Sequence, residues 1–169
     1  MMKIVEFEEF TFSYPLQEEN VLSQVNLSVE EGSLTLLCGV SGCGKSTLLR
    51  HLKTALTPHG KRQGHIRYRG QEIETWNQRQ QSSEIGFVFQ NPDNQIVTDK
   101  VWHEMAFGLE SLGMNQESIR LRVAEMASYF GMENWFERDV KELSGGQKQL
   151  LNLASVMALH PRLLILDEP

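Results

Sequence analysis

Gly39-Val40-Ser41-Gly42-Cys43-Gly44-Lys45-Ser46-Thr47 is the stretch of this sequence that decides the fold. It contains the pattern G-x-x-x-x-G-K-[ST], in which backbone N–H groups cradle phosphate groups. The apolar run Leu34–Cys38 before it predicts a buried strand, with Cys38 as a buried strand residue. The run Ser46–Leu52 after it predicts a helix with one apolar face, formed by Leu48, Leu49 and Leu52. The phosphate cradle is therefore expected between a strand and a helix.

The chemistry of the cradle follows from its residue types. Glycines at 39, 42 and 44 let the backbone adopt positive φ and approach a ligand closely. Successive N–H groups then form an anion nest, and the helix adds its unpaired N–H groups. Lys45 is expected to reach the β- and γ-phosphates and Ser46 to ligate Mg²⁺. The alternative is a glycine-rich turn with a chance lysine. The predicted nucleotide-binding residues of the cradle are Gly39, Ser41, Gly42, Cys43, Gly44, Lys45, Ser46 and Thr47.

The composition is that of a globular protein. The chain has 169 residues, enough for one domain with a sizeable core, and 40% of them are hydrophobic. No apolar run approaches the roughly 20 residues that span a bilayer, and the N-terminus lacks the apolar segment of a signal peptide. A cytoplasmic location is therefore expected. The formal net charge of −6 argues against nucleic acid as a partner, since such binding depends on lysine and arginine. The basic stretch Lys61–Arg69 is interpreted as a solvent-exposed strand face.

Periodicity and turn residues divide the chain into an antiparallel beginning, a helical middle and a final strand. Strands are expected at 3–14, 21–30, 65–68, 85–89 and 163–166, and helices at 101–112, 115–130 and 148–159. Asn115 is expected to cap its helix and Gly131 to end it. We interpret the chain as α/β: a P-loop NTPase core with an N-terminal antiparallel β subdomain and an inserted α-helical subdomain. Residues 1–90 and 160–169 are assigned to the core, and 91–159 to the insertion.

Polar residues follow three of the predicted strands. The cradle follows one, Gln90 follows a second, and Asp167 and Glu168 follow the last. Ligands of open α/β sheets bind at the C-terminal ends of strands, so these groups are expected to converge on one nucleotide. An aspartate in this position supports the Mg²⁺ of a phosphate cradle, here through water. Glu168 is expected to orient an attacking water. The alternative is an ordinary acidic pair at a strand end.

A further motif is similar to that of a known family. Leu143-Ser144-Gly145-Gly146-Gln147 resembles the signature of ATP-binding cassette (ABC) ATPases, and it precedes the apolar strand that ends in Asp-Glu-Pro. The cradle also has the family's form, G-x-x-G-x-G-K-S-T. The resemblance extends from about residue 3 to residue 169, with the motifs in the family's order.

This resemblance implies roles for individual residues. Tyr14 is expected to stack on adenine, and Gln90 to reach Mg²⁺ and the attacking water. Ser144, Gly145, Gly146 and Gln147 are expected to bind the γ-phosphate of ATP held by a second ABC ATPase subunit, so that ATP closes a head-to-tail dimer. The implied catalytic residues are Glu168, Gln90 and Lys45, and the implied Mg²⁺ residues are Ser46, Gln90 and Asp167.

Within the family, the loop Phe89–Val97 resembles that of energy-coupling-factor and cobalt-type importers, which take up vitamins or metal ions. The resemblance implies transmembrane transporter subunits as partners and a peripheral position on the inner face of the cell membrane. Hydrophobic residues of the insertion are expected either to line a groove for the membrane subunit or to belong to the insertion core; they include Val97, Val101, Trp102 and Phe107.

The sequence also departs from the family. The family's chain continues past Asp-Glu-Pro with a loop that contacts the opposite subunit and a histidine that holds the γ-phosphate. Neither is present here, so weak or absent ATP hydrolysis is expected of these 169 residues. Two other functions stay open: a soluble ABC ATPase acting on nucleic acid or ribosomes, and a nucleotide-binding module without turnover. A P-loop kinase is disfavoured because Leu143–Gln147 would have no role in it.

Overall fold

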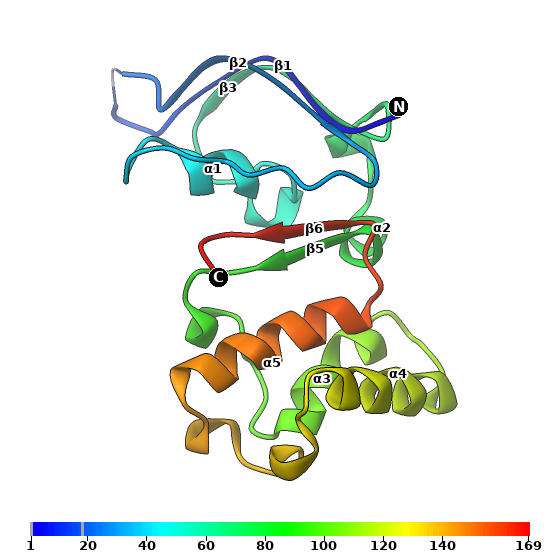
Figure 1. The fold of residues 1–169 in the computed structure, drawn as a ribbon. Coiled ribbons are helices and arrows are strands. Elements are labelled where there is room, and N and C mark those ends of the chain that lie inside the picture. Colours follow the sequence, from blue (N-terminus) through cyan, green and yellow to red (C-terminus); the bar gives the residue numbers. More distant parts are fainter. Residues whose placement is uncertain (1, 18) are drawn as a thin grey trace. The chain divides into compact units, whose positions relative to one another are not determined.

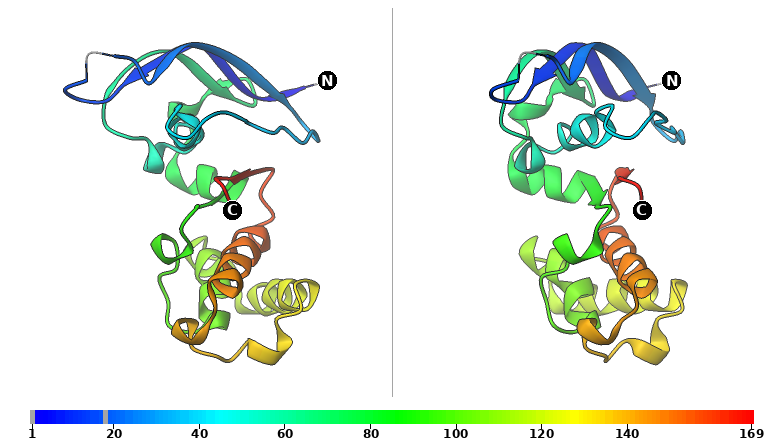
Figure 2. Two further views of the ribbon diagram at one scale, coloured as in Figure 1. Left: turned by 60° about the vertical axis from the view of Figure 1, so that its left-hand side comes forward. Right: turned by 90° about the vertical axis from the view of Figure 1, so that its left-hand side faces the viewer.

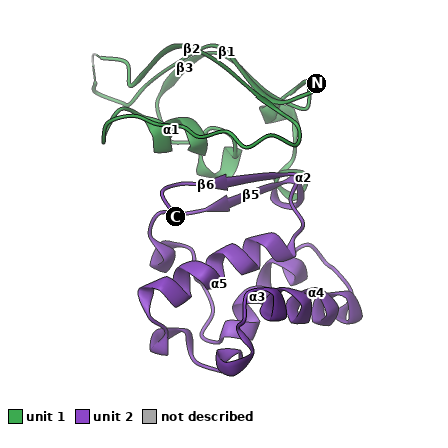
Figure 3. Cartoon of the chain, in the orientation of Figure 1, with its two compact units in different colours: residues 1–81 green, residues 82–169 purple. Residues whose placement is uncertain are grey.

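The computed structural model describes residues 2–17 and 19–169. It consists of two compact units, Met1–Gln81 (unit 1) and Ser82–Pro169 (unit 2), which Figure 3 distinguishes by colour. The assignment of 1–90 and 160–169 to one core and 91–159 to an insertion stays a prediction. Every helix within the described ranges is too short or too polar to traverse a lipid bilayer.

Unit 1 is built on an antiparallel sheet with the strand order β2-β1-β3-β4 (Figure 1). The strands are β1 (Lys3–Ser13), β2 (Leu22–Glu30), β3 (Lys61–Tyr68) and β4 (Gln71–Glu72). The central strand, β1, is rich in aromatic and β-branched residues, which suit the pleated surface of a sheet. The strands predicted at 3–14 and 21–30 are confirmed, and the strand expected at 65–68 begins earlier, at Lys61.

A β-bulge keeps the large side chains of β1 on one face. Phe7 and Phe10 are three residues apart, so strict alternation would place them on opposite faces, yet each is 2% exposed. Between them, Glu9 has a φ of 48°, and the register with β2 and with β3 shifts there. On β3, Gly64 has a φ of 85°, and a Cβ at this position would lie 2.5 Å from the Glu9 carbonyl oxygen. Close backbone approach at the bulge therefore requires glycine at position 64.

Helix α1 (Lys45–Arg50) lies against this sheet in all the views of Figures 1 and 2. Leu48 and Leu52 are each 5% exposed, which confirms the predicted apolar face, while Leu49 is half-buried. His51, at the end of the helix, is 1% exposed and contacts the rings of Phe10 and Phe12 edge-on, at centroid distances of 4.9 and 4.6 Å. These contacts attach the helix that follows the cradle to the aromatic core of the sheet.

Buried polar contacts hold the second half of unit 1 together. It contains 3₁₀ helices at Thr54–Leu56 and Ile73–Thr75, and α2 (Gln78–Glu84) begins near its end. The Gln81 side chain is 1% exposed, and its Oε1 accepts a hydrogen bond from the Thr54 N–H at 2.8 Å. Its Nε2 donates to the carbonyl oxygens of Ile73 and Trp76, at 3.1 and 2.8 Å. One buried amide thus joins three segments of the unit.

The strand predicted at Leu34–Cys38 is wrong in this structure. The segment belongs to neither sheet, and Leu34 and Leu36 are 100% and 84% exposed. Cys38, predicted to be buried, is exposed as well. The apolar run carries the composition of a buried strand, but a strand also needs hydrogen-bonded neighbours, and the sheet of unit 1 pairs β1, β2, β3 and β4 only.

Unit 2 combines a parallel strand pair with a helical layer. β5 (Ile85–Val88) pairs with β6 (Leu163–Leu166), and the register runs from Ile85 opposite Leu163 to Val88 opposite Leu166. The helices are α3 (Val101–Ser111), α4 (Gln116–Tyr129) and α5 (Gly145–Ala158), and short 3₁₀ helices lie at Pro92–Asn94, Glu133–Trp135 and Val140–Glu142. Figure 1 shows α5 between the strand pair and the other two helices.

Predicted helix boundaries of unit 2 are largely confirmed. The Asn115 Oδ1 accepts a hydrogen bond from the Ser118 N–H at 2.8 Å and caps α4, as expected. Gly113 lies just after the end of α3 and Gly131 just after the end of α4, and their φ values are 69° and 65°. Helix α5 begins three residues before the predicted start, because its N-terminus lies inside the signature segment. The core of the unit centres on side chains with no exposed area: Val101, Met105, Leu109, Met132, Leu151, Ala154 and Ala158.

Exposure decides between two alternatives for the apolar residues of the insertion and shows how deeply β6 is buried. Val101 belongs to the core and does not line a groove, whereas Val97 and Phe107 are 64% and 47% exposed. In β6, Ile165 is 5% exposed, but Leu164 and Leu166 are 37% and 43% exposed. The apolar run at 163–166 is therefore a strand, as predicted, but it is not buried on both faces.

The basic stretch Lys61–Arg69 is a strand face, as interpreted from the sequence, and acidic neighbours neutralise much of its charge. The Arg67 guanidinium lies 2.7 Å from the Glu8 carboxylate and also near Glu6 and Glu72. Arg62 is paired with Glu74 at 3.0 Å. These pairs, between partly exposed groups, leave little free positive charge on this face.

We predict that Gly64→Ala destabilises the protein by about 3 kcal/mol, because it adds a steric clash to the strain of a positive φ. The matched control is Gly70→Ala. Gly70 has a φ of 77° but open space around its Cβ position, so only the backbone strain of about 1 kcal/mol applies. Chemical denaturation measures both values, and equal losses for the two variants would contradict the proposed clash.

His51 predicts a pH dependence of stability. Burial lowers the pKa of His51 below its ordinary value of 6.5; the hydrogen bond to the Thr47 carbonyl and the charge of Glu74 oppose this effect, and Arg62 adds to it. The unfolded chain then binds more protons than the folded chain below pH 6.5, so the free energy of unfolding should fall as the pH drops below that value.

The variant His51→Asn keeps a donor for the Thr47 carbonyl but does not titrate. Its free energy of unfolding, measured by denaturation between pH 5 and 8, should therefore change less with pH than that of the wild type. The control is His59→Asn at an exposed position, which should keep the wild-type slope. An unchanged slope for His51→Asn would exclude His51 as the source of the pH dependence.

Candidate nucleotide site

The cradle loop is shaped by three glycines that act in two different ways. Gly42 and Gly44 have φ values of 83° and 95°, which other residues rarely adopt. Gly39 was also expected to have a positive φ, and it does not. Instead, a Cβ at Gly39 would lie 2.7 Å from the Cys43 sulfur, so the loop closes tightly on itself there. Positive φ at two positions and a close approach at the third therefore define the shape of the loop.

Lys45 folds back over the loop that precedes it. Its Nζ donates hydrogen bonds to the carbonyl oxygens of Gly39 and Val40, at 3.0 and 3.2 Å. The ammonium group is thus held at the mouth of the cradle by backbone acceptors from the loop's first two residues. A charged donor in this position suits an anionic ligand, which offers it stronger acceptors than neutral carbonyls.

Tyr14 is joined to the helix that follows the cradle. Its hydroxyl lies 3.0 Å from Thr47 Oγ1, and its ring contacts Phe12 edge-on with a centroid distance of 5.0 Å. Thr47 is 9% exposed, and its carbonyl oxygen accepts a hydrogen bond from His51 Nδ1 at 2.7 Å. The end of β1 and the start of α1 are therefore connected through Thr47. The expected stacking of Tyr14 on adenine stays a prediction.

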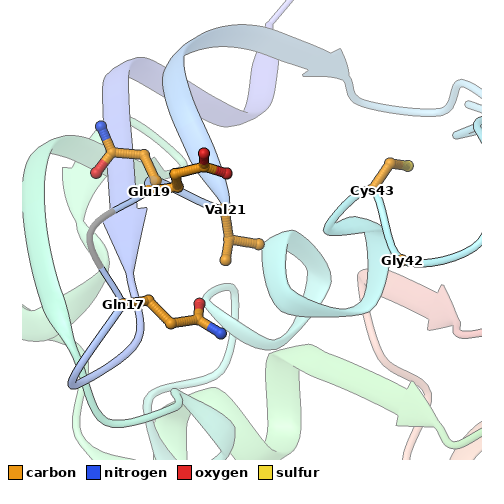
Figure 4. A pocket seen from close by; sticks show the side chains of 6 residues that line it. Gln17, Glu19, Val21, Gly42 and Cys43 are labelled. Atoms are coloured by element: carbon orange, nitrogen blue, oxygen red, sulfur yellow. The ribbon is translucent and has the colours of Figure 1, made fainter.

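A pocket of about 470 Å³ lies beside the cradle. Figure 4 shows Gln17, Glu19 and Val21, from the segment between β1 and β2, on one side, and Gly42 and Cys43 of the cradle on the other. The remaining lining residue is Asn20. The pocket is large enough for part of a nucleotide and combines amide, carboxylate and aliphatic groups. Residues 17–21 were not predicted to belong to a site, since a polar turn has no distinctive pattern.

In unit 2, the residues that follow β5 and β6 meet. Gln90 Nε2 donates a hydrogen bond to Glu168 Oε2 at 2.7 Å, although the residues are 78 positions apart in the chain. Asp167 is 3% exposed, and its N–H donates to the Val88 carbonyl oxygen at 3.0 Å, which extends the strand ladder by one step. Glu168 has a φ of 49°, which for a residue other than glycine costs about 1–3 kcal/mol. The structure thus brings together two of the three predicted strand-end groups.

The signature segment forms the start of α5. Ser144 Oγ accepts from the Gln147 N–H at 3.3 Å, and Gln147 Oε1 accepts from the Ser144 N–H at 2.9 Å, which is a capping box. Ser144, Gly145 and Gly146 are exposed. A Cβ at either glycine would meet no atom within 4 Å, so the packing of this chain does not require glycine there.

One residue of the Gln90 region was missed by sequence reasoning. Gln95 Oε1 accepts from the Phe89 N–H, and its Nε2 donates to the Phe87 carbonyl oxygen, both at 3.0 Å. The side chain therefore braces the loop against the end of β5. A glutamine in a polar loop carries no pattern that predicts such a brace.

Comparison with known proteins decides the family. The sequence model described as "ABC transporter" matches residues 22–169. The chain belongs to the ABC transporter family. This ABC chain is 45% identical over 169 residues to a Bacillus cereus protein provisionally named an ABC transporter ATP-binding protein, and spans 31% of its length. A similarly named Methanosarcina mazei protein is 35% identical over 166 residues, and the chain spans 50% of it.

Solved ABC structures share the fold. CbiO1 of Clostridium perfringens, described as part of the ABC transporter complex CbiONQ, matches with a TM-score of 0.85 and 29% identity, over 100% of this chain and 66% of CbiO1. The ATP-binding cassette MJ0796, solved as a dimer in a post-hydrolysis state with ADP and Pi, matches with a TM-score of 0.82 and 26% identity, over 96% of this chain and 72% of that one. The predicted α/β P-loop NTPase fold is confirmed, and the chain is an ABC ATP-binding region.

We predict that Mg²⁺-ATP slows the alkylation of Cys43. Both cysteines are exposed, but only Cys43 lies in the cradle and lines the pocket beside it. In the single-thiol variant Cys38→Ser, ATP at about ten times its Kd should lower the rate of N-ethylmaleimide labelling about tenfold, because only the free form reacts. The control, Cys43→Ser, reports on Cys38 and should change far less. Equal rates for Cys43 with and without ATP would show that it is merely a small residue that fits.

Proposed function

We propose that this chain is part of a subunit that binds and hydrolyses ATP and thereby powers a membrane transporter. The observation that carries the proposal is the meeting of Gln90 and Glu168, next to buried Asp167, at the ends of two parallel strands. An amide and two carboxylates in this position suit the metal and water handling of an ATPase. The cradle supplies the phosphate-binding half of the same chemistry.

The proposed roles follow the chemistry of each group. Lys45 and the cradle N–H groups bind the phosphates, and Tyr14 stacks on adenine. Ser46, Gln90 and Asp167 would hold Mg²⁺, with Asp167 acting through water; the ion neutralises phosphate charge when bound. Glu168 accepts a proton from the attacking water and orients it. As in phosphoryl transfer generally, the residues act by positioning and by stabilising charge.

The signature segment is proposed to act on a second subunit. The positive end of the α5 dipole, the Ser144 hydroxyl and two glycines with open space above them suit the close approach of an anion. ATP bound to one cradle would be completed by Ser144, Gly145, Gly146 and Gln147 of the other subunit. The MJ0796 cassette, which was solved as a dimer, supports the pairing of two subunits.

We further propose that the transporter is an importer for a vitamin or metal ion. The loop Phe89–Val97 carries the resemblance on which this rests, and the match to CbiO1, part of an ABC transporter complex, supports a membrane-bound assembly. Val97, at the end of this loop, and Phe107, on α3, have exposed apolar side chains and are the proposed contacts for a transmembrane subunit. The subunit would then act on the cytoplasmic face of the membrane.

Two substitutions in the complete transporter subunit separate binding from turnover. Lys45→Ala should abolish ATP binding in calorimetry, because the phosphates lose their charged donor. Glu168→Gln should bind ATP but lower kcat at least about 100-fold and trap an ATP-bound dimer, visible by light scattering. The control is Glu125→Gln, at an exposed position on α4, which should hydrolyse ATP at the wild-type rate. Normal hydrolysis by Glu168→Gln would refute the role given to Glu168.

A further inference from the structure

The start of α5 is fastened to the loop that carries Gln90. We call residues 89–95 the Gln90 loop. Lys148 Nζ lies 2.6 Å from Asp93 Oδ1, which makes a hydrogen-bonded ion pair. Asn152 Nδ2 donates to the Pro92 carbonyl oxygen at 3.2 Å, and Gln149 Nε2 to the Phe89 carbonyl oxygen at 3.5 Å. All three α5 side chains lie in the turns directly after the signature segment Leu143–Gln147.

The loop is itself stiff enough to transmit a displacement. Its 3₁₀ turn, Pro92–Asn94, is closed by Asn91 Oδ1, which accepts from the Asp93 N–H at 3.0 Å. Gln95 fixes the other end of the loop to β5 through its two hydrogen bonds with Phe87 and Phe89. A movement of α5 would therefore displace Asp93, and the hydrogen bonds within the loop would transmit that displacement to Gln90.

Gln90 in turn contacts the carboxylate of Glu168. The 2.7 Å hydrogen bond from Gln90 Nε2 to Glu168 Oε2 holds the carboxylate in its present orientation, and a base must be correctly oriented toward the water whose proton it takes. In this arrangement Glu168 is restrained as a base for as long as Gln90 stays where it is. A continuous series of contacts thus leads from the signature helix through Asp93 and Gln90 to Glu168.

The contact between α5 and the Gln90 loop leaves two buried polar atoms without a hydrogen-bond partner among the described residues. Gln149 Oε1 and Asn152 Oδ1 are buried and accept no hydrogen bond from any described residue. Buried acceptors without partners are costly, so a shift of α5 that gave them donors would be favoured and not resisted.

We infer that the Lys148–Asp93 ion pair is a positioning contact that couples the signature helix to the Gln90–Glu168 hydrogen bond. This inference rests on the proposed ATP hydrolysis. When the N-terminus of α5 takes up the γ-phosphate of a partner subunit's ATP, the helix draws Asp93 with it, Gln90 leaves Glu168, and the carboxylate becomes free to accept a proton. ATP is then hydrolysed only after the signature segment has bound the γ-phosphate of the ATP on the partner subunit.

Stability and coupling can be separated at this pair. The Asp93 and Lys148 side chains are 65% and 20% exposed, and ion pairs at such positions contribute little to the free energy of unfolding. Asp93→Asn and Lys148→Met should therefore fold with nearly the wild-type thermal midpoint. A second ion pair of unit 2, Lys100–Asp139 at 2.8 Å, forms no hydrogen bond or ion pair with the Gln90 loop among the described residues and serves as the matched control.

The test measures ATP hydrolysis by the complete transporter subunit. Asp93→Asn and Lys148→Met should each lower kcat about threefold, the size of effect expected from a partly exposed ion pair, while the KM for ATP stays constant. The double variant Asp93→Lys with Lys148→Asp should regain the lost activity, and Lys100→Met should match the wild type. Unchanged kcat in both single variants, or no recovery in the reversed pair, would overturn the inference.

A second readout needs no turnover. Hydrogen exchange of the backbone amides at 90–95 and at 144–149 should rise together in Asp93→Asn, and should stay at wild-type values in Lys100→Met. A wild type that does not hydrolyse ATP would refute the proposed function, yet linked exchange would still support the coupling. Exchange that rises at only one of the two segments, or at neither, would refute the coupling itself.

Discussion

The parallel pairing of β5 with β6 is the contact on which the arrangement of unit 2 depends. Its register sets Val88 opposite Leu166, so both strands end at the same level and the residues after them share one edge. A parallel pair needs a long crossover connection, and the helices α3, α4 and α5 lie within it. Because α5 returns the chain to β6, its first turns pass the Gln90 loop. Four backbone pairings thus determine which polar side chains can meet.

In unit 1, the sheet holds the short glycine-rich cradle loop in a fixed shape. The loop has few contacts of its own, and α1 has only six residues, so neither would be rigid in isolation. The sheet supplies the rigidity through the aromatic rings of Phe10 and Phe12, which pack on His51, and through Tyr14, which is bonded to Thr47. The bulge at Glu9 brings Phe7, which precedes it, to the same face as these rings.

Local patterns predicted local structure well. Asn115 as a cap, Gly131 as a helix end and the strands β1, β2 and β5 all follow from side-chain chemistry within a few residues of the chain. Interactions between distant residues could not be predicted in the same way. Asp93 and Lys148 are 55 positions apart, and each alone is an ordinary surface charge. The segment Leu34–Cys38 failed for the same reason, since its hydrophobicity says nothing about whether a neighbouring strand pairs with it.

The open space around Gly145 and Gly146 has a consequence for how the chain tolerates mutation. Glycine is among the poorest helix formers, by up to about 1 kcal/mol relative to alanine, and nothing in the packing of this chain excludes a side chain at either position. At Gly86, by contrast, a Cβ would lie 2.5 Å from Val156 Cγ1, and the fold itself demands glycine. Selection for abundance or heat resistance alone would therefore replace the two signature glycines and keep Gly86. In the first turn of α5, the two glycines lower the stability of the helix and leave its backbone uncovered by side chains.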